Sequence, residues 1–443
     1  NNDEENPKPD DFAAMMRQMQ EQIQKQFQEL GINPAGFINP FANFAPGAKG
    51  QQEALPIATV RDTAKKFVQA QGSQPLGTKD VTVVNNALEI AELWLNEATV
   101  FPATALGAGQ TSLSRLDWVD ETLPGWQATM EPLATGLATA ISSLLDQAIA
   151  GQGGADADGQ EDALAALAGS MGAIAGLLRS FIGSMIATQL GQAIGAISSN
   201  ATGAHDVALP LLDPARPILI PENIEKWSAD IEIPKTEVYL FHALREAAIA
   251  RLFAHNPWIV SYMRSAIVEY GRGIRIDMEA IQRQAEEAMQ NFDPTQMNPE
   301  SGENSFNIAL NNGIFTPEET PEQRAALSKL ETALALVDGW ADEVTTLAAG
   351  DRLPAITQLR EIYRRQRATN APAQQLFKSL LGLEVSPKLT REASAFWQKV
   401  RESKDVASRD ALWSGILPSA EELLDPVAFL SSTQVPDDLS GLL

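Results

Sequence analysis

The chain has 443 residues, of which 44% are hydrophobic, so it is long and apolar enough to bury a large core. It contains no cysteine, which excludes disulfide bonds, thiolate metal sites and a cysteine nucleophile, and which fits a cytoplasmic location. The formal net charge of −24 argues against a nucleic-acid partner, because binding to phosphates depends on clustered Lys and Arg.

Residues 1–50 are expected to form a flexible N-terminal tail. The opening stretch NNDEENPKPDD is acidic and lacks the basic and apolar parts of a secretory signal. Phe and Met recur with helical spacing over residues 12–30, which predicts an amphipathic helix, either free or docked in the groove of a partner. The Gly-, Pro- and Asn-rich segment that follows does not favour regular structure.

Residues 51–160 form a predicted N-terminal helical region. The stretch NNALEIAELWLNEAT places Leu88, Ala91, Leu95 and Ala98 near one face of a helix. The segment GQGGADADGQED, which begins at Gly151, lacks the bidentate Glu that completes a calcium loop. We interpret it as a linker.

The segment Leu164–Ser198 is rich in Gly and Ala and could be mistaken for a membrane span. Arg179 near its centre makes exposure to lipid costly. Gly191 and Gly195 would let two helices approach closely. We therefore predict buried helices and no membrane insertion.

Residues 161–443 are predicted to form the main helical body. The apolar runs VALPLL and PILI, punctuated by Pro, predict one or two short strands near residues 207–220. Helices are expected to resume at Lys235 and to continue to about Asn291.

A long helix is expected over the segment that ends at Ala349. Thr320 is typical of an N-cap, Pro321 of the first helical position, and Gln323 of a capping box. Further helices are predicted at roughly 353–369, 372–382 and 388–403. The expected fold class is mainly α, with a few short strands.

Residues 241–258, FHALREAAIARLFAHNPW, have the frame of a zinc peptidase helix, which carries H-E-x-x-H. Two His at positions i and i+4 share one face and hold zinc, while the Glu polarises the attacking water. Here Glu246 keeps the middle position, but Arg245 and Ile249 stand where the imidazoles belong. Ile249 has no donor atom, and the fixed positive charge of Arg245 opposes a cation.

Several stretches together resemble the zincin-like type 2 family: REAAIARLFAHNPWI, VEYGRGIRID, LETALALVDGWADEV, GDRLPAI and RDALW. The resemblance covers most of the chain from about residue 55. It implies a zincin-like helical body and a hydrolase or zinc-dependent metalloprotease whose substrate is unknown. It also implies that Arg245 and Ile249 take zinc-ligand positions, Glu246 the general-base position, and Asp338 the third-ligand position. The sequence departs from the family pattern at both imidazoles.

Two other residues compete for roles in such a site. Glu269 lies twenty residues after Ile249 and is an alternative third ligand to Asp338. His242, four residues before Glu246, is a possible substitute ligand, since a His with two carboxylates can bind zinc or manganese.

An Arg–carboxylate pair balances charge without an ion. We therefore expect Arg245 to pair with Asp338 or Glu246 in the space that the metal would occupy. No cofactor is expected, although zinc is the cofactor of the wider family.

The chain has only three His residues. His255 precedes Asn256–Pro257, where the helix must end, so its predicted role is structural. His205 precedes a predicted strand and is expected in a loop or at the surface.

Three functions compete. The first is a degenerate zincin-like protein that lacks zinc and binds a peptide or protein partner through the old cleft, and this is the one we expect. The second is an active metal-dependent hydrolase with a rearranged site that uses His242, Glu246 and a carboxylate. The third is a structural protein in which the tail and the Gly/Ala helices hold a homo-oligomer together.

Overall fold

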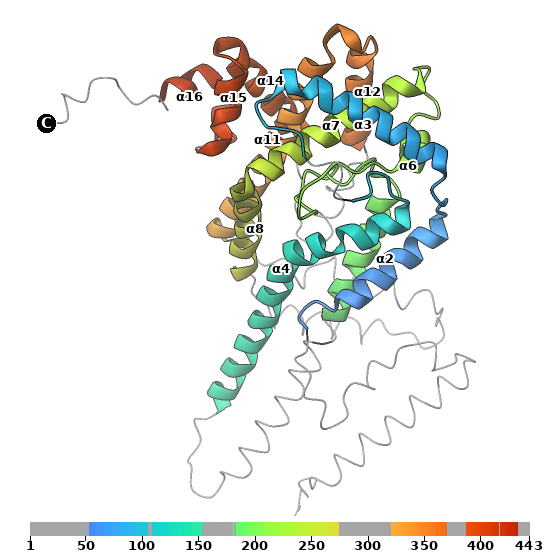
Figure 1. Ribbon diagram of the computed structural model, residues 1–443. Coiled ribbons are helices and arrows are strands. Elements are labelled where there is room, and N and C mark those ends of the chain that lie inside the picture. The colour runs from blue at the N-terminus through green and yellow to red at the C-terminus, as the bar shows by residue number, and fades with distance from the viewer. Residues whose placement is uncertain are drawn as a thin grey trace, which may run out of the picture. The chain divides into compact units, whose positions relative to one another are not determined.

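A computed structural model describes residues 53–104, 109–152, 180, 183–273, 320–369, 387–415 and 417–432 (Figure 1). The chain divides into two compact units, 1–52 and 53–443, and all described residues belong to the second. The expected N-terminal tail with its helix, the linker after Gln152, and the helix predicted at 372–382 lie outside the described residues.

The described residues form a mainly helical fold, as predicted. Its helices are α2 (Ile57–Gln71), α3 (Thr78–Ala98), α4 (Arg115–Gln152), a helix over residues 183–198, α6 (Pro221–Trp227), α7 (Lys235–His255), α8 (Pro257–Arg272), α11 (Pro321–Ala349), α12 (Ile356–Thr369), α14 (Pro387–Ser403), α15 (Val406–Ala411) and α16 (Pro426–Ser432). Short 3-10 turns at Gly350–Arg352, Leu412–Ser414 and Glu422–Leu424 join the C-terminal elements.

The short strands predicted near residues 207–220 are reduced to isolated bridges. Within the described residues Leu219 pairs with Ser112 in parallel and with Gly203 in antiparallel fashion, and neither pairing extends into a strand. The physical reason is the proline content of this segment, since Pro210, Pro214 and Pro217 lack the amide hydrogen that a ladder needs.

Helix α7 lies at the centre of the fold. Its side chains are buried almost without interruption from Val238 to Phe253, including the charged Arg245, Glu246 and Arg251. Helices α3 and α11 pack on it, and α11 also packs against α8 and α14. A helix that is buried all round brings its polar residues into the core, where each of them needs a partner.

Two predicted helix ends are confirmed. Thr320 caps α11: the Gln323 amide donates to Thr320 Oγ1 at 3.1 Å, and the Thr320 amide donates to Gln323 Oε1 at 3.2 Å. Helix α7 ends at His255, and Pro257 starts α8.

The close helix packing predicted for Gly191 and Gly195 is also confirmed. A Cβ atom added to Gly191 would lie 2.7 Å from the carbonyl oxygen of Val60 on α2. A Cβ atom on Gly195 would lie 2.7 Å from the Cβ of Phe67 on the same helix. No helix among the described residues is long and apolar enough to cross a membrane.

Gly191→Ala is expected to lower the free energy of unfolding by about 1–2 kcal/mol, because the new methyl group collides with the α2 backbone. This collision outweighs the helix preference of Ala over Gly, which is about 1 kcal/mol. Urea denaturation measures the change. Gly415→Ala is the control, since a Cβ there meets no atom within 4 Å. Equal stability of the two variants would contradict the packing described.

Candidate functional site

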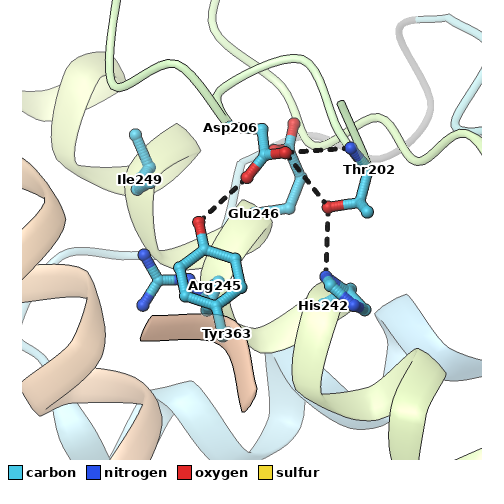
Figure 2. A pocket seen from close by; sticks show the side chains of 7 residues that line it. All are labelled: Thr202, Asp206, His242, Arg245, Glu246, Ile249 and Tyr363. Carbon is cyan, nitrogen blue, oxygen red and sulfur yellow. Dashed lines mark hydrogen bonds between the residues drawn. The ribbon is translucent and has the colours of Figure 1, made fainter. Parts of the chain in front are cut away.

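Seven side chains from loop 202–206, α7 and α12 surround a small pocket, which Figure 2 shows from close by. The lining residues are Thr202, Asp206, His242, Arg245, Glu246, Ile249 and Tyr363. Between them is room for about one water molecule. The pocket therefore lies directly on the H-E-x-x-H-like frame of α7.

Glu246 is held by the backbone of the loops that pack on α7. Its Oε1 accepts hydrogen bonds from the amides of Ala204 at 3.0 Å and Ile218 at 3.1 Å, and its Oε2 accepts one from the amide of His205 at 3.0 Å. A Cβ atom on Gly203 would lie 2.3 Å from Oε2, so only glycine allows this approach. Glu246 thus joins residues 203–205 to Ile218, which places the loop on α7.

His205 lies in a loop, which was one of its two predicted positions, but none of its surface is exposed, so the alternative of a surface position is wrong. Its Nδ1 lies 2.8 Å from Glu246 Oε1, and its ring packs 5.7 Å from that of Phe253. The sequence could not show this contact, because 41 residues separate the two partners.

Arg245 pairs with Asp338 of α11, as predicted, and the alternative pair with Glu246 is not formed. The guanidinium also lies 3.9 Å from Asp342 and stacks over the Tyr363 ring at 4.2 Å. Burial opposes the charged form of Arg245, but Tyr363, Asp338 and Asp342 together raise its pKa. Arg245 is therefore a permanent cation in the core.

Asp342, which the sequence analysis did not identify, is the anionic centre of this cluster. Arg360 of α12 donates to both of its oxygens, at 3.0 and 2.6 Å, and Arg364 donates at 2.7 Å. Ser394 of α14 adds a further hydrogen bond at 2.7 Å. Burial acts to raise the pKa of Asp342, but Arg360, Arg245 and Arg364 lower it overall, so the carboxylate stays charged.

Asp206, which lines the pocket, forms a second anionic centre. Tyr363 donates to Oδ1 at 2.9 Å and Arg367 donates to the same oxygen at 2.6 Å, while the Thr202 amide donates to Oδ2 at 3.0 Å. Burial would raise the pKa of Asp206, but the Arg367 charge and these hydrogen bonds lower it.

His242 continues this chain of polar groups. Its Nδ1 lies 3.0 Å from Thr202 Oγ1, which in turn lies 3.4 Å from Asp206 Oδ2, as the dashed lines in Figure 2 show. Burial lowers the pKa of His242 to about 3, with Asp206 opposing and Arg245 and Arg367 adding to the effect. The imidazole is therefore neutral at pH 7. Its Nε2 is buried and has no hydrogen-bond partner in the described part of the chain.

The other predicted site residues divide between the pocket and the surface. Ile249 lines the pocket with a buried side chain. Glu269 lies apart on α8, where its side chain is 45% exposed and pairs with Lys329. The structure therefore brings Asp338 rather than Glu269 together with Arg245.

Helix α12 contributes Arg360, Tyr363, Arg364 and Arg367, none of which was among the predicted site residues. Arg360 and Arg364 are four residues apart, as are Tyr363 and Arg367, so each pair extends from neighbouring parts of one helix face. This spacing was a visible signal of a charged face. Its acidic partners come from α11 and the 202–206 loop, which no local pattern connects to α12.

Comparisons with known proteins agree with this architecture. A sequence profile of a family described as zincin-like metallopeptidase matches residues 57–430. The crystal structure of "a putative hydrolase with a novel fold" from Chloroflexus aurantiacus is similar in fold, with a TM-score of 0.55 at 14% identity. The similarity covers 86% of this chain and all of that one. No curated protein matches the sequence.

Glu246→Gln is expected to lower the free energy of unfolding by about 1–3 kcal/mol, because the amide group turns an NH₂ toward backbone donors that need an acceptor. Chemical denaturation measures the loss. Glu97→Gln is the matched control, since Glu97 is a surface residue 70% exposed that pairs with Arg352. Unchanged stability in Glu246→Gln would contradict the structural role of this carboxylate.

The depressed pKa of His242 predicts a loss of stability in mild acid. The unfolded chain takes up a proton on this residue below about pH 6.5, whereas the folded chain does so only near pH 3. The free energy of unfolding is therefore unaffected by His242 above pH 6.5, and it decreases as the pH falls, by roughly 2 kcal/mol at pH 5.

Stability measured from pH 7 to 4.5 should therefore fall less steeply in His242→Gln than in the parent protein. This window avoids the range below the ordinary carboxyl pKa values, where Asp206 and Asp342 titrate. His255→Gln is the comparison variant: burial and the Arg251 charge also lower the pKa of this exposed imidazole, but less than that of His242, so His255→Gln should change the pH dependence less. A pH dependence unchanged by His242→Gln would rule out a buried neutral imidazole.

Proposed function

The chain belongs to the zincin-like metallopeptidase family, and from this premise we propose that it is a member without the zinc centre that acts by binding a peptide or protein. The observation that carries the proposal is the ion pair between Arg245 and Asp338, in which the Arg245 guanidinium stacks on the ring of Tyr363. The proposal rests on the chemistry of the side chains at the inherited site.

The residues at the family's ligand positions do not fit zinc. A catalytic zinc site needs three nitrogen or oxygen donors and an open fourth position. At the positions that the family resemblance assigns to the two imidazoles, this chain has the cationic side chain of Arg245 and the aliphatic side chain of Ile249. In the described part of the chain no group of three His, Asp or Glu side chains is arranged to hold a metal ion.

The carboxylates of the site have partners that make an ion unnecessary. Asp338 pairs with Arg245, and Asp342 pairs with Arg360 and Arg364. A buried charge is stabilised when an opposite charge and hydrogen bonds replace its lost water. The guanidinium of Arg245 would thus serve here as the positive charge that a metal supplies in active relatives.

An active hydrolase with a rearranged site has less support. Its general base would be Glu246, whose oxygens accept from three backbone amides and lie beside His205. Its substitute ligand would be His242, whose Nδ1 faces Thr202 rather than Glu246. A peptidase activity that is lost in a folded Glu246→Gln protein would favour this alternative.

Metal analysis of the protein, purified without chelator, is expected to give far less than one zinc ion per chain. The measurement is elemental analysis by mass spectrometry, normalised to protein concentration. Near-stoichiometric zinc would overturn the proposal. The positive comparison is Arg245→His combined with Ile249→His, which restores both imidazoles beside Asp338 and is expected to gain zinc.

A further inference from the structure

Helix α12 is attached to the rest of the protein through arginines and through an apolar face that includes Ile356 and Ile362. Arg360 and Arg364 reach Asp342 on α11, and Arg367 reaches Asp206 in the 202–206 loop. Two apolar or aromatic side chains, Leu359 and Tyr363, are buried beneath the helix. Tyr363 also covers the pocket, where its ring lies over Arg245 (Figure 2).

If α12 were displaced together with its arginines, the surface beneath it would be acidic. Asp338 and Asp342 then keep one guanidinium, that of Arg245, and Asp206 loses its ion pair with Arg367, which leaves three negative charges against one positive charge. The Glu246 carboxylate adds to the negative side of this balance, because the backbone amides that hold it stabilise its charge without neutralising it. The bare surface would therefore attract a cation.

The unpartnered nitrogen of His242 points to the same kind of ligand. In the tautomer that keeps the chain continuous, Nδ1 donates to Thr202 Oγ1, and the Thr202 hydroxyl donates to Asp206 Oδ2. Nε2 is then a buried acceptor without a donor, in a side chain only 2% exposed that lines the pocket. A guanidinium offers the N–H donors that such an acceptor lacks.

We propose that the acidic surface formed by Asp206, Asp338 and Asp342 is a docking site for an arginine-bearing segment of a partner protein, and that α12 occupies it in the free chain. This inference rests on the binding function proposed above and names the chemistry of the partner. Arginine is favoured over lysine because a planar guanidinium can pair with both oxygens of a carboxylate, as Arg360 does with Asp342.

The charge of the whole chain supports such a partner. A net charge of −24 draws basic segments toward the protein and repels acidic ones. The partner would replace contacts that α12 already makes. Its binding therefore requires the free energy that breaks the ion pairs of α12. Weakening those pairs should open the site to a peptide added from outside.

The probe is a labelled peptide with the sequence of residues 355–369, AITQLREIYRRQRAT, whose binding is followed by fluorescence anisotropy. The full-length protein should bind it weakly, and the full-length Arg360→Gln/Arg364→Gln variant at least about ten-fold more tightly. Adding Asp342→Asn to that variant should remove the gain. Binding should also weaken as the salt concentration rises, because exposed charge pairs are screened.

Two altered peptides separate charge-specific docking from general attraction. A peptide with Arg364→Gln, which removes one arginine that reaches Asp342, should bind more weakly than the parent peptide. A peptide with Arg365→Gln is the matched control and should bind like the parent, since Arg365 is 78% exposed and pairs with Glu361 within α12. Equal effects of the two peptides would show non-specific attraction and overturn the proposal.

Hydrogen exchange on the unmodified protein tests the same inference without a destabilised variant. Saturating peptide should increase amide exchange in α12 while leaving α7 protected. Unchanged exchange in α12 would show that α12 is a permanent part of the fold, and binding that persists with Asp342→Asn would show that the peptide binds elsewhere. Either result would overturn the proposal. A protein that lacks zinc and fails to bind the peptide would refute this inference and leave the proposed function standing.

Discussion

The burial of charged side chains on α7 is the constraint on which the rest of the structure depends. Arg245, Glu246 and Arg251 lie in the core with 5% or less of their surface exposed. An isolated charge in such a place would cost several kcal/mol, so each requires a partner at hydrogen-bonding distance. The loops and helices around α7 are arranged as those partners.

Each of these buried charged side chains is hydrogen-bonded or ion-paired to a different part of the chain. Glu246 binds backbone amides of the two arms of the loop before α6, and Arg251 binds Glu92 on α3. Arg245 binds Asp338 on α11 and stacks on Tyr363 of α12. The site region is thereby tied to elements far apart in sequence. At Asp338 and Asp342 the positive charges come from arginine side chains of α7 and α12.

The need to pair buried charges also explains the two roles of α12. Its arginines complete the neutralisation of Asp206 and Asp342, and its tyrosine covers the pocket. Charge pairs of this kind are specific in geometry and sensitive to competitors of like charge, unlike apolar packing. Such a helix can be both a structural member and the occupant of a site.

The helical class, the capped start of α11 at Thr320, the end of α7 at His255 and the close packing at Gly191 follow from local sequence, because periodicity, capping and residue size act within a few residues. The pair of Arg245 with Asp338 could be predicted from the resemblance and from the need of a cation for an anion. The burial of His205, the backbone grip on Glu246 and the cluster around Asp342 could not. They depend on which distant segments meet, and three-dimensional packing alone decides that, because no local pattern specifies contacts between residues at least 18 positions apart.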